Sequence, residues 1–256
     1  MRRLMVAAAA ALAIAAGSMA PAVLAAEKAE IPHVDFPHVG VFGKYDMHAV
    51  QRGLQVYQEV CHACHSLKRI AFRNLTAIGL TEDQAKAIAE TYQIEDGPNE
   101  AGDMYERAGR LSDYFPSPFP NMNAARASNN GAYPPDLSLI TKGRDGHEAY
   151  VYGILTGYEE EPPEGFHLSE GMYYNRVFAG HQIAMPPPLT DGQVEYVDGT
   201  EASVANMAHD VVTFLAWAAE PELEERKALG LKVLIFVGLL TAVLYAINVR
   251  VWSRVT

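Results

Sequence analysis

Both cysteines of this 256-residue chain lie in one short stretch, "EVCHACHSL", at residues 59–67. Four side chains that can bind a metal or react covalently fall within five positions there: Cys61, His62, Cys64 and His65. Such a cluster can form a redox-active pair, contribute to a zinc site, or hold a covalently attached cofactor. Each possibility makes a different demand on the rest of the chain, so this stretch limits the possible folds more than any other.

A redox pair and a zinc site find little support elsewhere in the sequence. Redox-active Cys-x-x-Cys pairs accompany a βαβ pattern, whereas residues 46–61 predict a helix with Asp46 as its N-cap and an apolar stripe that ends at Cys61. Structural zinc usually takes four ligands, commonly from two separated pairs, and the chain has no second cysteine pair. His62, between the cysteines, would point away from a site that they share.

The order Cys-x-x-Cys-His is the signal for covalent attachment of a c-type haem. Cys61 and Cys64 are predicted to add across the two vinyl groups of the haem, and His65 is predicted to bind the iron from one side. His62 is then a spacer. We therefore expect one haem c, with the redox pair and the zinc site as the remaining alternatives.

The second axial ligand belongs among the methionines and histidines. The methionines that follow residue 26 are Met47, Met104, Met122, Met172, Met185 and Met207. Met185 stands directly before three prolines, which keep the backbone extended and can hold its thioether against the iron without a helix. His181, nearby, is the alternative. A His65/Met185 pair fills both axial positions and predicts a one-electron carrier, whereas an open position would indicate a peroxidase or a gas sensor.

The two ends of the chain predict export and a membrane anchor. Residues 1–26 contain two early arginines, an apolar run and a small-residue end, as a cleaved secretory signal does; an N-terminal anchor is the alternative. Within residues 222–256, a helix over 229–249 would be roughly 31 Å long, the thickness of the hydrocarbon core of a bilayer. We therefore expect a periplasmic haem domain over 27–221, one membrane crossing and a short cytoplasmic tail.

Between these ends, helices alternate with proline-rich loops. A capping box at Thr81 and Gln84 predicts the start of one helix, and residues 145–158 and 203–220 are periodic enough for two more. Segments such as "YFPSPFPNMN" and "AMPPPL" cannot form regular helix or sheet interior. The expected fold class is mainly α, a c-type cytochrome domain with long proline-rich loops and one C-terminal transmembrane helix. A large cofactor would hold such loops together.

Several motifs resemble, in their order along the chain, those of the cytochrome c1 family, the haem subunit of the ubiquinol–cytochrome c oxidoreductase (cytochrome bc1) complex. They are "CHACH", "ARASNNGAYPPDLS", "ILTGY", "YYNRVFAGHQIAMPPPL", "YVDGT" and "FLAWAAEPELEERKALGLK". The alphaproteobacterial form is the most similar. The resemblance implies that Cys61 and Cys64 attach the haem, that His65 and Met185 are its axial ligands, and that Arg126 lies near a haem propionate.

The resemblance also implies the partners of the chain: cytochrome b, the Rieske iron–sulfur protein as electron donor, and a soluble or membrane-anchored cytochrome c as acceptor. Membrane lipid would surround the anchor, and a net charge of −11 gives no reason to expect nucleic acid. The chain alone would carry electrons, while enzymatic quinol oxidation would belong to the complex. An acidic loop with Glu159, Glu160, Glu161 and Glu164 could attract a basic acceptor. A membrane-tethered carrier for a terminal oxidase or a photosynthetic reaction centre is the alternative.

Two features depart from the family pattern. Tyr133 stands where an aliphatic residue is expected, so the local haem packing is expected to differ. No cysteine pair remains for a disulfide once the haem is attached, so we expect packing alone to hold the loop around Met185. The neighbouring segment "PPDLS", residues 134–138, resembles the loop that packs against the haem edge.

Overall fold

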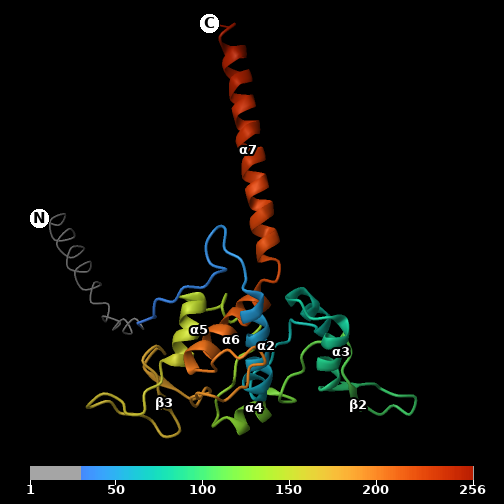
Figure 1. Ribbon diagram of the computed structural model, residues 1–256, viewed down its shortest axis with the longest axis vertical. Helices are drawn as coiled ribbons and strands as arrows, with labels where there is room; N and C mark the ends of the chain where they lie inside the picture. The colour runs from blue at the N-terminus through green and yellow to red at the C-terminus, as the bar shows by residue number, and fades with distance from the viewer. Residues whose placement is uncertain (1–29, 256) are drawn as a thin grey trace, which may run out of the picture.

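Two helices that cross at a glycine form the centre of the fold. A computed structural model describes residues 30–255 (Figure 1). In it, helix α2 (Met47–Glu59) packs against helix α6 (Val204–Ala219). A Cβ atom at Gly53 would lie 2.0 Å from the carbonyl oxygen of Asp210. The missing side chain therefore allows the two backbones to approach this closely. The expected signal segment, residues 1–26, lies outside the described residues.

The helix starts follow the local capping residues that the sequence predicts. The carboxylate of Asp46 accepts hydrogen bonds from the backbone at the start of α2. Thr81 and Gln84 form a reciprocal capping box at the start of α3 (Glu82–Glu90). The Ser203 hydroxyl, which was not among the predicted caps, caps α6 by accepting a hydrogen bond from the Asn206 backbone N–H. Each cap satisfies backbone N–H groups that have no partner inside the helix.

The remaining elements of the domain are short and lie between long loops. They are η1 (Cys61–Ala63), η2 (Phe72–Ile78), β1 (Gln93–Asp96), β2 (Tyr105–Ala108), α4 (Met122–Ser128), α5 (His147–Thr156), β3 (Tyr173–Tyr174) and β4 (Gln182–Ile183). Strand β1 pairs antiparallel with β2, and β3 pairs antiparallel with β4. The mainly α fold class is confirmed, while the two small sheets were not predicted.

An aromatic cluster fills the core between α2, η2 and α6. The ring of Phe115 lies 4.5 Å from that of Phe72 and meets Tyr57 edge-on at 5.7 Å. Tyr57 in turn contacts Phe214 of α6 at 5.8 Å. All four side chains are almost completely buried. Because Tyr57 lies near the end of α2, this cluster provides a rigid base directly before the cysteine-containing turn.

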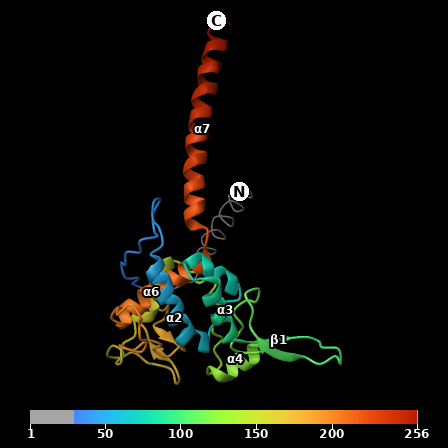
Figure 2. The same ribbon diagram turned by 45° about the vertical axis from the view of Figure 1, so that its right-hand side comes forward.

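Helix α7 (Leu223–Trp252) projects from one end of the domain as a single long rod (Figures 1 and 2). An 18-residue window within it has a mean hydropathy of 2.2, and none of that window is buried. The helix is therefore long and apolar enough to cross a membrane, as the sequence predicted. The helix begins at Leu223, whereas the apolar run predicted to cross the membrane begins at residue 229. The first two turns of α7 are charged and lie against the domain, so they are not part of that run.

A network of polar contacts fastens α7 to the domain. The Glu220 carboxylate, between α6 and α7, pairs with Lys142 and with Arg226. The Tyr45 hydroxyl donates toward two backbone carbonyl oxygens, those of Ala216 at 3.0 Å and Glu220 at 3.1 Å. The Glu220–Arg226 pair joins the end of α6 to α7, and the backbone N–H of Tyr45 donates to the Glu224 carboxylate of α7 at 3.1 Å. The junction between the two helices is therefore fixed from several sides, and we call it the braced corner.

Candidate functional site

The two cysteines lie in the tight turn η1 that follows α2. The backbone N–H groups of Cys64 and His65 both donate to the carbonyl oxygen of Cys61, at 3.1 and 2.9 Å. Both thiols are free; Cys61 is half-buried and Cys64 is exposed. Burial and the neighbouring Cys64 raise the pKa of Cys61 to about 12. Within residues 30–255 no group of three or more His, Cys, Asp or Glu side chains could hold a metal ion.

The ring of His65 is held by a hydrogen bond to a distant loop. Its Nδ1 atom lies 2.8 Å from the carbonyl oxygen of Pro135. Because a carbonyl oxygen only accepts, Nδ1 carries the proton and Nε2 keeps its lone pair. Burial lowers the pKa of His65, which favours the neutral imidazole. The side chain is therefore oriented as metal-binding histidines generally are, with one nitrogen bonded to a carbonyl and the other available for iron.

The loop that holds His65 is itself fixed by the carboxylate of Asp136. This carboxylate accepts hydrogen bonds from the Ser66 hydroxyl at 2.8 Å, the Lys68 backbone N–H at 3.0 Å and the Ser138 backbone N–H at 3.0 Å. Burial opposes ionisation of Asp136, but these hydrogen bonds prevail and lower its pKa. The segment "PPDLS" thus lies beside the turn after His65, where it can define one wall of a haem crevice.

His62 belongs to the aromatic core. Its Nδ1 atom lies 3.2 Å from the Tyr57 hydroxyl, and its ring meets that of Tyr92 edge-on at 4.9 Å. Burial lowers the pKa of His62. This packing agrees with the prediction that His62 is a spacer between the cysteines. It also gives the residue a structural role that the spacing alone did not indicate.

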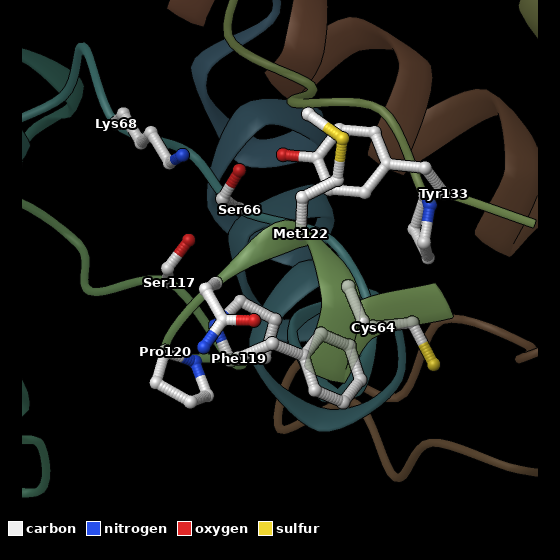
Figure 3. Close-up of a pocket in the computed structure, with 12 residues that line it drawn as sticks. Cys64, Ser66, Lys68, Ser117, Phe119, Pro120, Met122 and Tyr133 are labelled. Carbon is white, nitrogen blue, oxygen red and sulfur yellow. The ribbon is translucent and has the colours of Figure 1, made fainter. Parts of the chain in front are cut away.

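A small cavity adjoins the turn on the side of Cys64 (Figure 3). Its volume is about 180 Å³, and its walls include Cys64, Phe119, Met122 and Tyr133. Ligand pockets commonly measure roughly 300–1,000 Å³, so this space is smaller than a site for a whole tetrapyrrole. Neither His65 nor Met185 is among the described residues that line it. The cavity therefore borders the attachment turn and places Tyr133, the residue that departs from the family pattern, beside Cys64.

Met185 lies in the bend that follows β4 and is half-buried. The hydroxyl of Tyr158 donates a hydrogen bond of 2.9 Å to the carbonyl oxygen of Met185. Tyr158 also forms an isolated antiparallel bridge with Asn175, directly after β3. The expectation that packing alone holds this loop was therefore wrong, because a side-chain hydrogen bond to the backbone also fixes it. The sequence indicated that no disulfide holds this loop, but it did not indicate the hydrogen bond from Tyr158 to the Met185 backbone.

The other candidates for the second axial position lie in different surroundings. Met207 is completely buried in the core, and Met47 is partly buried and packs against that core. Met104 and Met122 are more than half exposed. The ring of His181 stacks on Tyr174 with centroids 5.8 Å apart. Its Nδ1 atom is buried without a hydrogen-bond partner among the described residues. His181 therefore stays the alternative to Met185.

Arg126 lies on the exposed side of α4. Its Nη1 atom donates to the carbonyl oxygen of Gly131 at 2.7 Å, and its guanidinium carbon lies 5.9 Å from the ring centroid of Tyr133. No carboxylate within residues 30–255 lies within ion-pair distance of it. The simple alternative, a surface ion pair, thus lacks support in the described part of the chain. Contact with a haem propionate stays a prediction.

A Cys-x-x-Cys-His turn at the end of a buried helix, in which the final histidine has its Nδ1 bonded to a backbone carbonyl, defines a c-type cytochrome. Residues 36–255 match the model of the Cytochrome C1 family. The chain therefore belongs to the cytochrome c1 family, as its motifs indicated. Members of this family carry covalently bound haem c, so the predicted cofactor is confirmed.

The chain is similar to cytochrome c1 from bacteria and from mitochondria. It is 47% identical over 236 residues to cytochrome c1 of Rhodospirillum rubrum, covering 86% of this chain and 87% of that protein. It is 52% identical over 203 residues to the mitochondrial haem protein cytochrome c1-2 of Solanum tuberosum, covering 79% of this chain and 78% of that protein. It is also 51% identical over 235 residues to cytochrome b/c1 of Bradyrhizobium diazoefficiens, covering 84% of this chain but only 34% of that longer protein.

Proposed function

We propose that this chain is the haem subunit of a cytochrome bc1 complex and passes one electron at a time from the Rieske iron–sulfur protein to a cytochrome c. The single observation that carries the proposal is the orientation of His65, whose Nδ1 is bonded to Pro135 and whose Nε2 is left for iron. A relative from Candida albicans, 52% identical over 204 residues, is named a catalytic subunit of the cytochrome b–c1 complex. Haem would supply the one-electron redox chemistry, and the chain would bind and orient it.

The proposed attachment uses both thiols of the turn. Cys61 and Cys64 would each add across a vinyl group, so that the sulfur bonds one vinyl carbon and a proton reaches the other. No electrons are gained or lost overall. His65 would bind iron through Nε2 from the side of the turn. Two covalent links and an oriented imidazole would hold the haem in one place, and the haem would supply one-electron redox chemistry there.

Met185 would supply the second protein ligand of the iron. The Tyr158 hydroxyl holds the Met185 carbonyl, and the three prolines that follow limit the backbone, so the thioether is delivered by a constrained segment. His/Met ligation raises the reduction potential and leaves no open position for oxygen or peroxide. Arg126, which has no carboxylate partner among residues 30–255, would neutralise a propionate. These assignments make electron transfer the function that the residues support best.

The acidic loop offers a surface for the acceptor. Glu159, Glu160, Glu161 and Glu164 are all exposed, and among residues 30–255 the only cation within ion-pair distance of any of them is Arg176, 4.0 Å from Glu159. This loop extends away from the body near β3 (Figure 1). Opposite charges raise association rates and are screened by salt. A basic cytochrome c would therefore dock here, with the haem domain in the periplasm and the tail after α7 in the cytoplasm.

Purification of the full chain in mild detergent, combined with haem spectra, tests this function. We expect cytochrome b and the Rieske protein to co-purify, and the haem c to be reduced by quinol only when both are present. Purification without either partner would favour a tethered carrier for another acceptor. Avid binding of carbon monoxide by the native reduced protein would contradict the filled axial positions and with them the proposed carrier function.

A further inference from the structure

A short apolar loop lies next to the first turns of α7. We call residues 38–44, "HVGVFGK", the interfacial loop. The side chains of Val39, Val41 and Phe42 are 58%, 72% and 80% exposed, so its apolar groups face outward. Figures 1 and 2 both show this loop, in blue, projecting in the direction of α7 beside its base. Exposed apolar side chains that cluster beside the base of α7 indicate a surface that contacts lipid or another protein, because exposing such a cluster to water is unfavourable.

The interfacial loop is closed on itself. The backbone N–H groups of Val39, Gly43 and Lys44 donate to carbonyl oxygens of residues 36, 40 and 37. A Cβ atom at Gly43 would lie only 2.3 Å from the carbonyl oxygen of Val39, so the tight closure needs glycine there. Paired backbone groups lower the cost of moving a loop out of water.

Lys227 joins the interfacial loop to α7. Its ammonium group donates to the carbonyl oxygens of His38 at 2.7 Å and Gly43 at 3.0 Å. One side chain of the helix thus satisfies both ends of the loop. The loop is therefore held against the helix in a fixed position.

The loop extends along α7 as far as its apolar part. A groove of about 820 Å³ lies between them and is lined by the loop together with Leu231 and Leu234. Leu234 lies roughly 10 Å along the helix axis from Lys227, at 1.5 Å per residue. The apolar run of α7 has already begun there. The loop therefore lies at the depth where the helix would enter a bilayer.

The charges around this groove are largely used within the chain. Glu220 pairs with Lys142 and Arg226, and Lys227 is bonded to the loop. The surface left for a partner is therefore mainly apolar. This favours acyl chains over a charged protein or a specific anionic headgroup.

We propose that the interfacial loop inserts into the membrane interface as a second point of attachment, and that lipid acyl chains occupy the groove between the loop and α7. The argument rests on continuity with a helix long and apolar enough to span the membrane. A covering protein subunit is the competing occupant, and the test separates the two. The proposal goes beyond electron transfer, since it concerns how the domain meets the bilayer.

Site-directed spin labelling of the full haem-loaded chain in phosphatidylcholine and phosphatidylglycerol vesicles, alone and within its complex, tests the proposal. If both native cysteines carry haem, an introduced cysteine is the only free thiol, a step that rests on the proposed function. The label goes to Phe42→Cys, with Leu239→Cys as the membrane reference and Val197→Cys, a completely exposed position of the domain, as the aqueous reference. Labelling of the chain without an introduced cysteine would reveal unattached native thiols, which separates a failure of haem attachment from a failure of the proposal.

Collisions with oxygen and with a soluble nickel chelate measure depth. We expect the oxygen-to-nickel ratio at Phe42→Cys to shift from the Val197→Cys value toward the Leu239→Cys value. A ratio equal to that of Val197→Cys would overturn the proposal. An immobilised label shielded from both reagents would also overturn it, by showing a protein partner. If Leu239→Cys itself reads as aqueous, α7 does not span the membrane and the proposal fails with it.

A second pair of variants tests the connection through Lys227. Lys227→Gln should shift the Phe42→Cys label toward water, because it weakens the bonds to both ends of the loop. Lys232→Gln, the same substitution further along α7, is the matched control and should leave the depth unchanged. Equal depths in the two variants would overturn the part assigned to Lys227.

Discussion

The hydroxyl of Tyr158 and the carbonyl oxygen of Met185 lie 2.9 Å apart, so the residue that ends the "ILTGY" motif holds the proposed axial ligand through its backbone. Tyr158→Phe removes this bond without changing the ring. We expect a loss of about 0.5–1.5 kcal/mol of loop stability, so that the thioether leaves the iron at a lower temperature. The absorption band of methionine-ligated ferric haem, followed during heating, measures this change. Tyr173→Phe, at an exposed ring in the adjoining strand, is the control; equal behaviour of the two variants would contradict the role of Tyr158.

Met185→Leu should lower the reduction potential substantially and allow carbon monoxide to bind the reduced haem. Leucine keeps the volume of methionine but has no thioether for iron. Potentiometry and carbon monoxide difference spectra measure the two effects. Met104→Leu, at an exposed methionine, should change neither. An unchanged potential in Met185→Leu would move the ligand elsewhere, and His181→Ala would be the next variant to measure.

Gly53→Ala should destabilise the domain by about 3 kcal/mol, because overpacking at a close helix crossing forces the backbones apart. Its Cβ would lie 2.0 Å from the Asp210 carbonyl oxygen and 2.7 Å from the Cβ of Phe214. Chemical denaturation of the haem-loaded protein measures the loss. Gly238→Ala is the matched control, since its Cβ meets no atom within 4 Å. A Gly53→Ala variant as stable as the control would contradict the close crossing of α2 and α6.

Acid should remove the stabilisation that the Arg107–Asp113 pair provides. Arg107 donates to Asp113 from both terminal nitrogens, at 2.6 and 3.1 Å, and lowers the pKa of that carboxylate. A carboxylate with a lowered folded pKa contributes its full stabilisation above the ordinary value of about 3.9. That contribution is lost as the pH falls through the lowered value.

The variant Asp113→Asn should therefore be less stable than the parent by about 1 kcal/mol at neutral pH, the upper range for such accessible pairs. The difference should shrink as the pH falls below about 4. Thermal unfolding at a series of pH values measures it. Asp103→Asn, at an exposed carboxylate, should follow the parent throughout. A constant difference across the series would show that Asp113 acts through something other than its charge.

Local signals in the sequence predicted the parts of the fold that depend on near neighbours. Asp46 and Thr81 cap their helices through bonds to residues two or three positions away, so their spacing alone was sufficient. Hydropathy indicated the part of α7 suited to a bilayer, residues 229–249, but not the charged turns with which the helix begins at Leu223. The β1–β2 and β3–β4 pairs were missed, since strands this short have too little periodicity to show a pattern.

In the candidate site, too, the residues that form a local motif were predicted, and the contacts between distant residues were not. Cys61, Cys64 and His65 form one contiguous motif, whereas Pro135 holds His65 from 70 residues away through a backbone carbonyl. Every residue has a backbone carbonyl, so the residue type at position 135 could not indicate that this one accepts a hydrogen bond from His65. Asp136 and Tyr158 lie inside the quoted motifs, but only the structure shows what their side chains hold. The ligation by Met185 and the role of Arg126 stay predictions.

The braced corner at Glu220 limits how the domain can move. Tyr45 and the two cations around Glu220 join the end of α6 to α7, which prevents the domain from swivelling freely on its anchor. A haem bound to a domain fixed in this way would keep a constant height above the bilayer. If the chain transfers electrons as proposed, movement between the site where an electron is collected and the site where it is delivered would fall to the donor and the acceptor, with this subunit as a stationary relay between them.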